Sequence, residues 1–116
     1  MSAVLDGVVL LTAVANTGFA IADFVRAKFV LATSAEVQVP TSWLPMLGLL
    51  KLAGAVGLFA GLAGVPVVGP AAAAGLTLFF IGAVTRHIQT RVFHNIAFPA
   101  SVLLVSVASL VATLRW

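Results

Sequence analysis

Long apolar runs, separated by a few charged residues, dominate the pattern along the chain. A helix needs about 20 mostly apolar residues to cross the roughly 30 Å hydrocarbon core of a membrane. The run between Lys51 and Arg86 is too long for one crossing, and glycines and prolines interrupt it near its middle. It therefore predicts two helices joined by a tight turn. The whole pattern predicts four membrane-spanning helices, at about residues 3–25, 44–63, 67–88 and 95–114.

The apolar runs favour helices over the strands of a membrane barrel. Segments such as AAAAGLTLFFIGAV do not alternate between polar and apolar residues, as barrel strands must. A helix also satisfies its own backbone hydrogen bonds within lipid. We expect a single all-α domain over residues 1–116, an integral membrane bundle of four transmembrane helices. The opening MSAVLDG lacks the basic residues that begin a signal peptide, so the first helix is expected to be retained.

The composition supports a membrane protein and limits the kinds of partner that we expect. Hydrophobic residues make up 62% of the chain and charged residues 8%, against about half and a quarter in globular domains. The net charge of +3 comes from scattered basic residues, which do not form the basic stripe that nucleic-acid binding needs. The chain has no cysteine, which excludes disulfides, cysteine-ligated metals and thiol catalysis. We expect contact with the lipid bilayer, membership of a homo-oligomer or larger membrane complex, and no nucleic-acid partner.

The few charges predict how the helices are oriented. An even number of spans places both termini on one side and the loops at 26–43 and 86–94 on the other. These two loops hold most of the basic residues: Arg26, Lys28, Arg86 and Arg91. Because cytoplasmic loops are enriched in Lys and Arg, both loops are predicted to lie in the cytoplasm. The expectation is a multi-pass protein of the cell (inner or plasma) membrane with both termini outside.

Small residues recur at helical spacing in the second and third predicted helices. Helices in lipid associate through close packing of such residues. The residues expected to pack helices together are Ala53, Gly57, Gly61, Ala71 and Gly75. On the last helix, a stripe of hydroxyl side chains is predicted to face protein: Ser106, Ser109 and Thr113. The same features suit contacts within one bundle or between copies.

Strongly polar residues collect toward the predicted cytoplasmic half of the bundle. They are Asn16, Asp23, Lys51, Arg86, His87, His94 and Asn95. Structural explanations exist: Asp23 is expected to pair with Lys51 or Arg86, or Lys51 to extend toward the headgroups. The same residues also suit a site for protons or a small lipophile. The spacing of the two histidines matches no metal motif, so no metal site is predicted. No cofactor is predicted either, with a quinone or haem as the alternatives; catalytic residues remain unassigned.

Three segments resemble the DoxX-like family of small four-helix membrane proteins, especially its short actinobacterial members: NTGFAIADFVRAKFV, AEVQVPTSWLPMLGLLKLAGAVGLFAG and FFIGAVTRHIQTRVFHNIAFP. The resemblance covers nearly the whole chain. It implies a link to redox systems, since some relatives are membrane subunits of a thiosulfate:quinone oxidoreductase and others are associated with oxidative stress. Many members have Glu at the position of Lys51, so the resemblance implies no acidic role there. The enzyme activity is not transferred, because this chain lacks cysteines for sulfur chemistry.

Three functions are compatible with the sequence. The first is a non-catalytic accessory or scaffold subunit of a redox or cell-envelope membrane complex. The second is a binder of, or an enzyme acting on, a small lipophile such as a quinone at the polar cluster. The third is a small multidrug-type transporter, which this sequence disfavours because Asn16 stands where a mid-helix carboxylate is needed. We favour the first and lean away from an enzyme.

Overall fold

The computed structural model describes residues 3–116, which fold into helices without any strand in that range. The elements are α1 (Ala3–Phe24), α2 (Lys28–Glu36), the 3-10 helix η1 (Thr41–Trp43), α3 (Leu44–Leu62), α4 (Val68–Gln89) and α5 (Ala97–Leu114). The four long helices, α1, α3, α4 and α5, are each long and apolar enough to cross a membrane. Their ends differ from the predicted spans by only a residue or two. The all-α bundle with four candidate spans is therefore confirmed.

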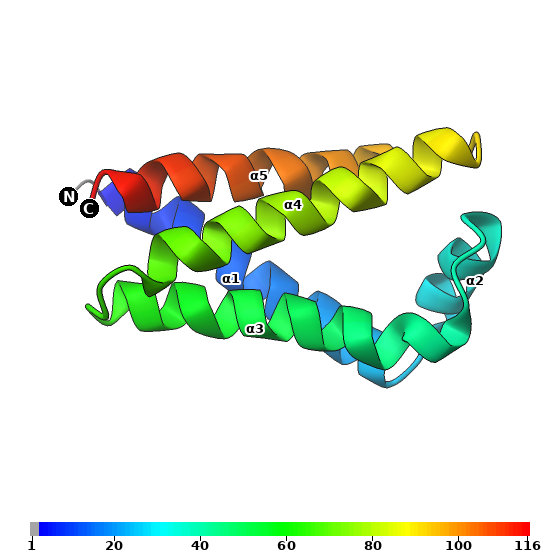
Figure 1. Cartoon of the computed structure of the whole chain (residues 1–116), viewed down its shortest axis with the longest axis horizontal. Helices are drawn as coiled ribbons and strands as arrows, with labels where there is room; N and C mark the ends of the chain where they lie inside the picture. Colours follow the sequence, from blue (N-terminus) through cyan, green and yellow to red (C-terminus); the bar gives the residue numbers. More distant parts are fainter. Residues whose placement is uncertain (1–2) are drawn as a thin grey trace.

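The long helices form a closed ring in which each one packs against the next along the chain. Helix α3 lies between α1 and α4, and α5 closes the ring between α4 and α1. The start of α1, the end of α5 and the α3–α4 turn lie at one end of the bundle, which we call the terminal end (Figure 1). Helix α2, η1 and the α4–α5 turn lie at the opposite end, the loop end (Figure 1). In the α3–α4 turn, Gly64 has a φ of 103°, a conformation that suits glycine.

Helix α2 is the main departure from the expected organisation. The segment at 26–43 was expected to be a loop, but Lys28–Glu36 is helical and η1 leads directly into α3. Residues with a left-handed backbone flank α2, namely Arg26 (φ 53°) and Gln38 (φ 58°). A helix this short is marginal by itself and depends on its surroundings, so propensity gives it little signal. It is too short to span a membrane, and the number of spans is unchanged.

Glycines bring α3 and α4 into close contact toward the terminal end. A Cβ atom built on Gly57 would lie 2.6 Å from the Cβ of Ala72. One built on Gly61 would lie 2.9 Å from the Cα of Gly69. Neither position has room for a side chain, and such close approach is the way in which small residues pack helices in lipid.

The other three residues expected in this packing lie elsewhere. Ala53, Ala71 and Gly75 are exposed on the outside of the bundle, and a Cβ on Gly75 would meet nothing within 4 Å. Gly54 takes the place expected for Ala53, because a Cβ there would lie 2.5 Å from the side chain of Leu76. One residue turns the helix by about 100°, so a shift of one position selects a different face.

The hydroxyl stripe on α5 faces the interior, as predicted. Ser106, Ser109 and Thr113 are all buried. The Ser109 Oγ lies 2.7 Å from the Oγ1 of Thr12 on α1, which makes a hydrogen bond between the two helices. At the terminal end, the indole Nε1 of Trp116 donates to the carboxylate of Asp6, at 3.1 Å. Polar contacts of this kind complement the close packing of α3 against α4.

Candidate functional site

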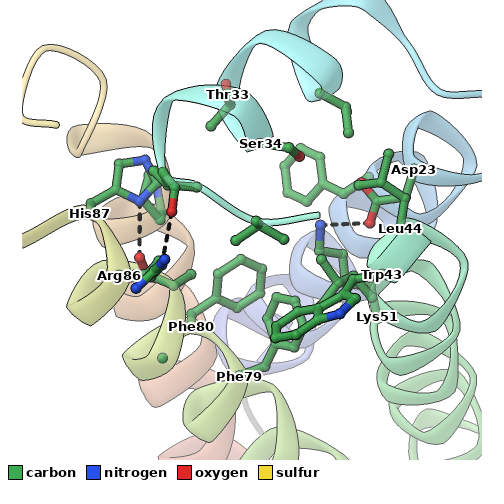
Figure 2. A pocket seen from close by; sticks show the side chains of 18 of the residues that line it. Asp23, Thr33, Ser34, Trp43, Leu44, Lys51, Phe79, Phe80, Arg86 and His87 are labelled. Atoms are coloured by element: carbon green, nitrogen blue, oxygen red, sulfur yellow. Dashed lines mark hydrogen bonds and ion pairs between the residues drawn. The ribbon is translucent and has the colours of Figure 1, made fainter. Parts of the chain in front are cut away.

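A cavity of about 850 Å³ opens between the helices at the loop end (Figure 2). Side chains from all four long helices line it, and the rest come from α2, the segment after it and Asn95 in the α4–α5 turn. Most of the lining is aromatic or aliphatic, including Phe19, Phe29, Leu44, Leu47, Phe79, Phe80 and Phe98. Small-molecule sites have about this volume and this mainly apolar character, with a few polar groups that orient the ligand.

An ion pair between α1 and α3 forms one polar wall of the cavity. The Nζ of Lys51 lies 2.8 Å from Oδ2 of Asp23, and their side chains are only 15% and 4% exposed. The same ammonium lies 5.4 Å from the centre of the Phe79 ring, within range of a cation–π contact. Lys51 therefore points into the bundle and neutralises Asp23, rather than extending to the headgroups. Pairing is the usual arrangement for charges at membrane depth.

Arg86 connects α4 to the segment that follows α2. Its Nε donates to the backbone carbonyl of Val37 at 2.8 Å, and Nη2 donates to that of Gln38 at 3.1 Å. Both acceptors lie just beyond the end of α2, where Gln38 has its left-handed backbone. Arg86 thus pairs with backbone carbonyls instead of Asp23. We call α2 and the residues after it, at 28–38, the cover of the cavity. The two hydrogen bonds of Arg86 connect this cover to α4.

His87 belongs to the cavity lining, and only one of its two ring nitrogens has a partner among the described residues. The residue is 5% exposed, and its Nδ1 lies 2.9 Å from the carbonyl oxygen of Ala83, one turn earlier on α4. Its Nε2 is buried and has no hydrogen-bond partner among the described residues. Oδ1 of Asn95, another residue of the cavity lining, is in the same situation. Such unpaired buried atoms are rare in native structures and call for an explanation.

The structure divides the predicted polar cluster into a group at the cavity and two outliers. The cavity is lined by Asp23, Lys51, Arg86, His87 and Asn95. The ring of His94 instead contacts the carboxylate of Glu36 of α2 outside the cavity lining, and more than half of the His94 side chain is exposed. Asn16 is fully buried deeper in the bundle, where its Nδ2 donates to the carbonyl of Thr12 at 3.0 Å.

Sequence reasoning missed the contribution of α2 and η1 to the cavity. The cover contributes Thr33, Ser34, Val37 and Gln38 to the lining, and η1 contributes Trp43. These residues were placed in a connecting loop, and no spacing in the sequence marks them as part of a site. Within residues 3–116, no group of three or more His, Asp or Glu side chains is arranged to hold a metal ion.

Comparison with protein families gives a match to the DoxX-like family over residues 7–109. The matched range begins in α1 and ends in α5, so it includes every residue that lines the cavity. Searches of curated proteins and of solved structures found no match to the chain.

Proposed function

The chain belongs to the DoxX-like family and is a multi-pass membrane protein, and on this premise we propose that it binds a small lipophilic molecule in the loop-end cavity. The observation that carries the proposal is a cavity of about 850 Å³ whose lining is mainly apolar, with a few polar side chains that include Asp23, Lys51 and His87. A ligand with an apolar body and a polar group would fill the space and contact these polar side chains. A quinone is one molecule of this general class.

Exposed apolar residues around the cavity support entry from the lipid. Phe29, Leu50 and Leu78 line the cavity, yet they are 56%, 51% and 70% exposed on the outer surface of the bundle. In a membrane, the outer surface of the long helices contacts acyl chains. A lipophile dissolved in the bilayer would therefore reach the cavity past these side chains without crossing water.

A matched pair of glycine variants on α4 tests this site. Gly82 lines the cavity and Gly75 lies on the outer surface, and both have open space where a Cβ would be. Gly82→Phe should fill the cavity, whereas Gly75→Phe adds the same side chain elsewhere. Protein purified in nanodiscs is extracted with solvent and its lipophiles are identified by mass spectrometry and ultraviolet–visible spectra. We expect one lipophile in stoichiometric amount in wild type and Gly75→Phe, and its loss in Gly82→Phe. Equal retention by both variants would refute this site.

The distribution of basic residues supports a cytoplasmic location for the cavity. Arg26, Lys28, Arg86 and Arg91 belong to the loop end, whereas Arg115 is the basic residue near the terminal end. By the positive-inside rule, we propose that the loop end lies in the cytoplasm and that the protein resides in the cell membrane.

The orientation is testable because the native chain has no cysteine. Val65→Cys reports on the α3–α4 turn and Thr90→Cys on the α4–α5 turn. A membrane-impermeant maleimide should label Val65→Cys in intact cells and label Thr90→Cys only after lysis. The reverse pattern would invert the orientation.

A second role, as a non-catalytic accessory subunit of a redox or cell-envelope complex, is supported by the outer face of α4. Ala71 and Gly75 are exposed there, and small residues let another helix approach closely in lipid. In this case Gly75→Phe should abolish co-purification of a partner from gently solubilised membranes, and Gly82→Phe should preserve it. Recovery of the same partner with both variants would count against this face.

A further inference from the structure

We infer that the ligand of the loop-end cavity carries an anionic head group, such as a carboxylate, which pairs with the guanidinium of Arg86. The inference rests on the proposed function and deepens it by naming the ligand class: an acyl-chain amphiphile with one negative charge. A free long-chain carboxylic acid and an anionic phospholipid share this chemistry. Neutral lipophiles, quinones among them, would leave the charge of Arg86 without a counter-ion.

The lining of the cavity contains one positive charge that no protein group neutralises. Its charged side chains are Asp23, Lys51 and Arg86. Lys51 and Asp23 neutralise each other, with 2.8 Å between the ammonium nitrogen and a carboxylate oxygen. The hydrogen-bond partners of Arg86 are neutral: two backbone carbonyls and the side-chain oxygen of Gln89. These acceptors orient the guanidinium, which stays protonated in proteins and keeps its full charge.

The acidic side chains of the protein are all engaged elsewhere. The chain has three Asp and Glu residues, and each lies in the described range. Asp23 holds the ammonium described above. Glu36 contacts the ring of His94 outside the cavity lining, and Asp6 lies at the terminal end, where it accepts from an indole. Because a charge beside an apolar cavity is costly without a partner, a counter-ion for Arg86 has to come from outside the chain.

The guanidinium of Arg86 is accessible to such an anion. Its Nη1 donates to Gln89 at 3.4 Å and its Nη2 to the carbonyl of Gln38 at 3.1 Å, and both bonds are exposed. A guanidinium has five N–H groups, so these bonds leave one N–H on each Nη nitrogen. Carboxylates and phosphates match arginine, because they accept charge-assisted hydrogen bonds from its planar fork. Arg86 can therefore hold an anion without releasing the cover.

The apolar part of the lining suits an acyl chain. Figure 2 shows Arg86 on one side of the cavity, the Asp23–Lys51 pair on the other, and the rings of Phe79 and Phe80 between them. A head group at Arg86 would place the acyl chain along these rings, in a cavity whose volume suits one small molecule. The exposed apolar side chains at its rim would let the chain enter from the bilayer.

Two probes that differ in charge test the inference: dibrominated stearate and its methyl ester. Bromine quenches tryptophan fluorescence on contact. Trp43 lines the cavity and Trp116 follows α5 at the terminal end, so Trp116→Phe leaves Trp43 as the reporter. Titrations use nanodiscs of neutral phosphatidylcholine at alkaline pH, which ionises the acid, and are corrected for partitioning into empty nanodiscs. Because hydrogen bonds to charged groups are the stronger ones, we expect the acid to bind about tenfold tighter or more.

Two substitutions separate the charge of Arg86 from its contacts with the cover. Arg86→Gln removes the charge and Arg86→Lys retains it, while both lose the guanidinium that bonds to the carbonyls of the cover. The preference for the acid should disappear in Arg86→Gln and persist in Arg86→Lys, with the ester as the measure of the cavity itself. A preference that survives in Arg86→Gln overturns the inference, and so does its loss in both variants.

The same titrations distinguish failure of the inference from failure of the proposed function. If the acid and the ester bind the reporter protein equally, the cavity stands and the anionic head group is wrong. If neither probe quenches Trp43 beyond the partitioning reference, the proposed function and the inference both fail.

Nanodiscs with increasing phosphatidylglycerol distinguish the two sources of the head group. Empty nanodiscs of the same composition correct for the repulsion of the acid by the charged bilayer. If the corrected affinity for the acid falls as phosphatidylglycerol rises, a phospholipid competes for Arg86 and is the ligand. An unchanged affinity assigns the site to a free acid.

A measurement on the unsubstituted protein covers the case in which the Arg86 variants do not fold. The lipophile extracted from wild type should be an acid, detected as an anion by mass spectrometry and in stoichiometric amount. Recovery of a neutral lipophile in that amount would overturn the inference while supporting the proposed cavity.

Discussion

The two ends of the bundle use the same four helices in opposite ways. At the terminal end, Gly57, Gly61 and Gly69 let α3 and α4 approach until no space remains for a side chain. At the loop end, aromatic side chains and a buried ion pair surround a cavity of about 850 Å³. Figure 1 shows that α4 and α5 diverge from α3 toward the loop end, where α2 lies.

This contrast shows how a short membrane chain can combine closely packed helices with an open cavity. Lipid is as apolar as the helix surfaces, so helices associate through close packing and polar contacts rather than by hiding apolar area. The terminal end has close packing at its glycines and a polar contact in the hydrogen bond between Thr12 and Ser109. The loop end is therefore free to keep its helices apart around polar groups. We therefore expect substitutions at the loop end to lower stability by leaving a charge unpaired, and substitutions at the terminal end to lower it by overpacking.

The largest effect is expected from breaking the ion pair at the loop end. Lys51→Met removes the ammonium and leaves the carboxylate of Asp23, only 4% exposed, without its partner. Removing one member of a buried pair typically costs about 3–5 kcal/mol. We expect a decrease of that order in the free energy of unfolding, measured by denaturant titration in mixed micelles.

A double variant provides the control for this prediction. Asp23→Asn combined with Lys51→Met removes both charges and should recover most of the lost stability, since neutral replacements of a buried pair are often tolerated. If Lys51→Met alone is as stable as wild type, the pair does not stabilise the loop end. The two ends of the bundle would then differ only in how closely their helices pack.

The next effect tests the close packing of the terminal end. A Cβ on Gly61 would lie 2.9 Å from the backbone Cα of Gly69 and 2.8 Å from the ring of Trp116. Gly61→Ala must therefore push α3 and α4 apart, and overpacking of this kind costs about 1–3 kcal/mol. Thermal unfolding in detergent should show a lower midpoint.

Gly75→Ala is the matched control on the outer surface, where a Cβ meets nothing within 4 Å. It should leave the midpoint unchanged or raise it slightly, because alanine favours the helix. Equal loss of stability in both variants would mean that glycine itself, and not close packing, is required.

The requirements of the membrane make the helices of this fold predictable from the sequence. The four spans follow from the apolar runs because lipid demands a minimum length and full backbone pairing. Which face of a span packs inward is less visible: Ala53 and Gly54 are both small, yet only Gly54 faces α4. Rotations of a fraction of a turn depend on the neighbouring helices, which the sequence does not display.

The candidate site was predictable as a location but not as a set of contacts. The grouping of Asp23, Lys51 and His87 at one end follows from counting polar residues along the spans. That Arg86 binds backbone carbonyls after α2, instead of Asp23, depends on a short helix with little sequence signal. The unpaired Nε2 of His87 is a property of three-dimensional packing alone. That these residues serve a ligand stays a prediction.

A smaller effect is expected from releasing the cover of the cavity. Arg86→Met removes the two hydrogen bonds to the carbonyls of Val37 and Gln38. These bonds are partly solvent-accessible, so we expect a loss of only about 1 kcal/mol. The sharper readout is local: amide hydrogen exchange should accelerate in α2 while the terminal end is unchanged. Arg91→Met, which removes the same charge from the neighbouring turn, is the control and should leave exchange in α2 as it was.

The smallest effect concerns the hydrogen bond between the side chains of Thr12 in α1 and Ser109 in α5. Ser109→Ala removes the hydroxyl that lies 2.7 Å from Oγ1 of Thr12. Hydrogen bonds between membrane helices contribute about 0.6 kcal/mol on average, so the loss should be of that order. Ser101→Ala is the matched control, because the Ser101 hydroxyl is exposed and bonds to Ala97 on its own helix. A double-mutant cycle with Thr12→Val isolates the coupling from the bond that Thr12 also makes to Val8. A coupling energy near zero would mean that the hydrogen bond between Thr12 and Ser109 does not stabilise the bundle.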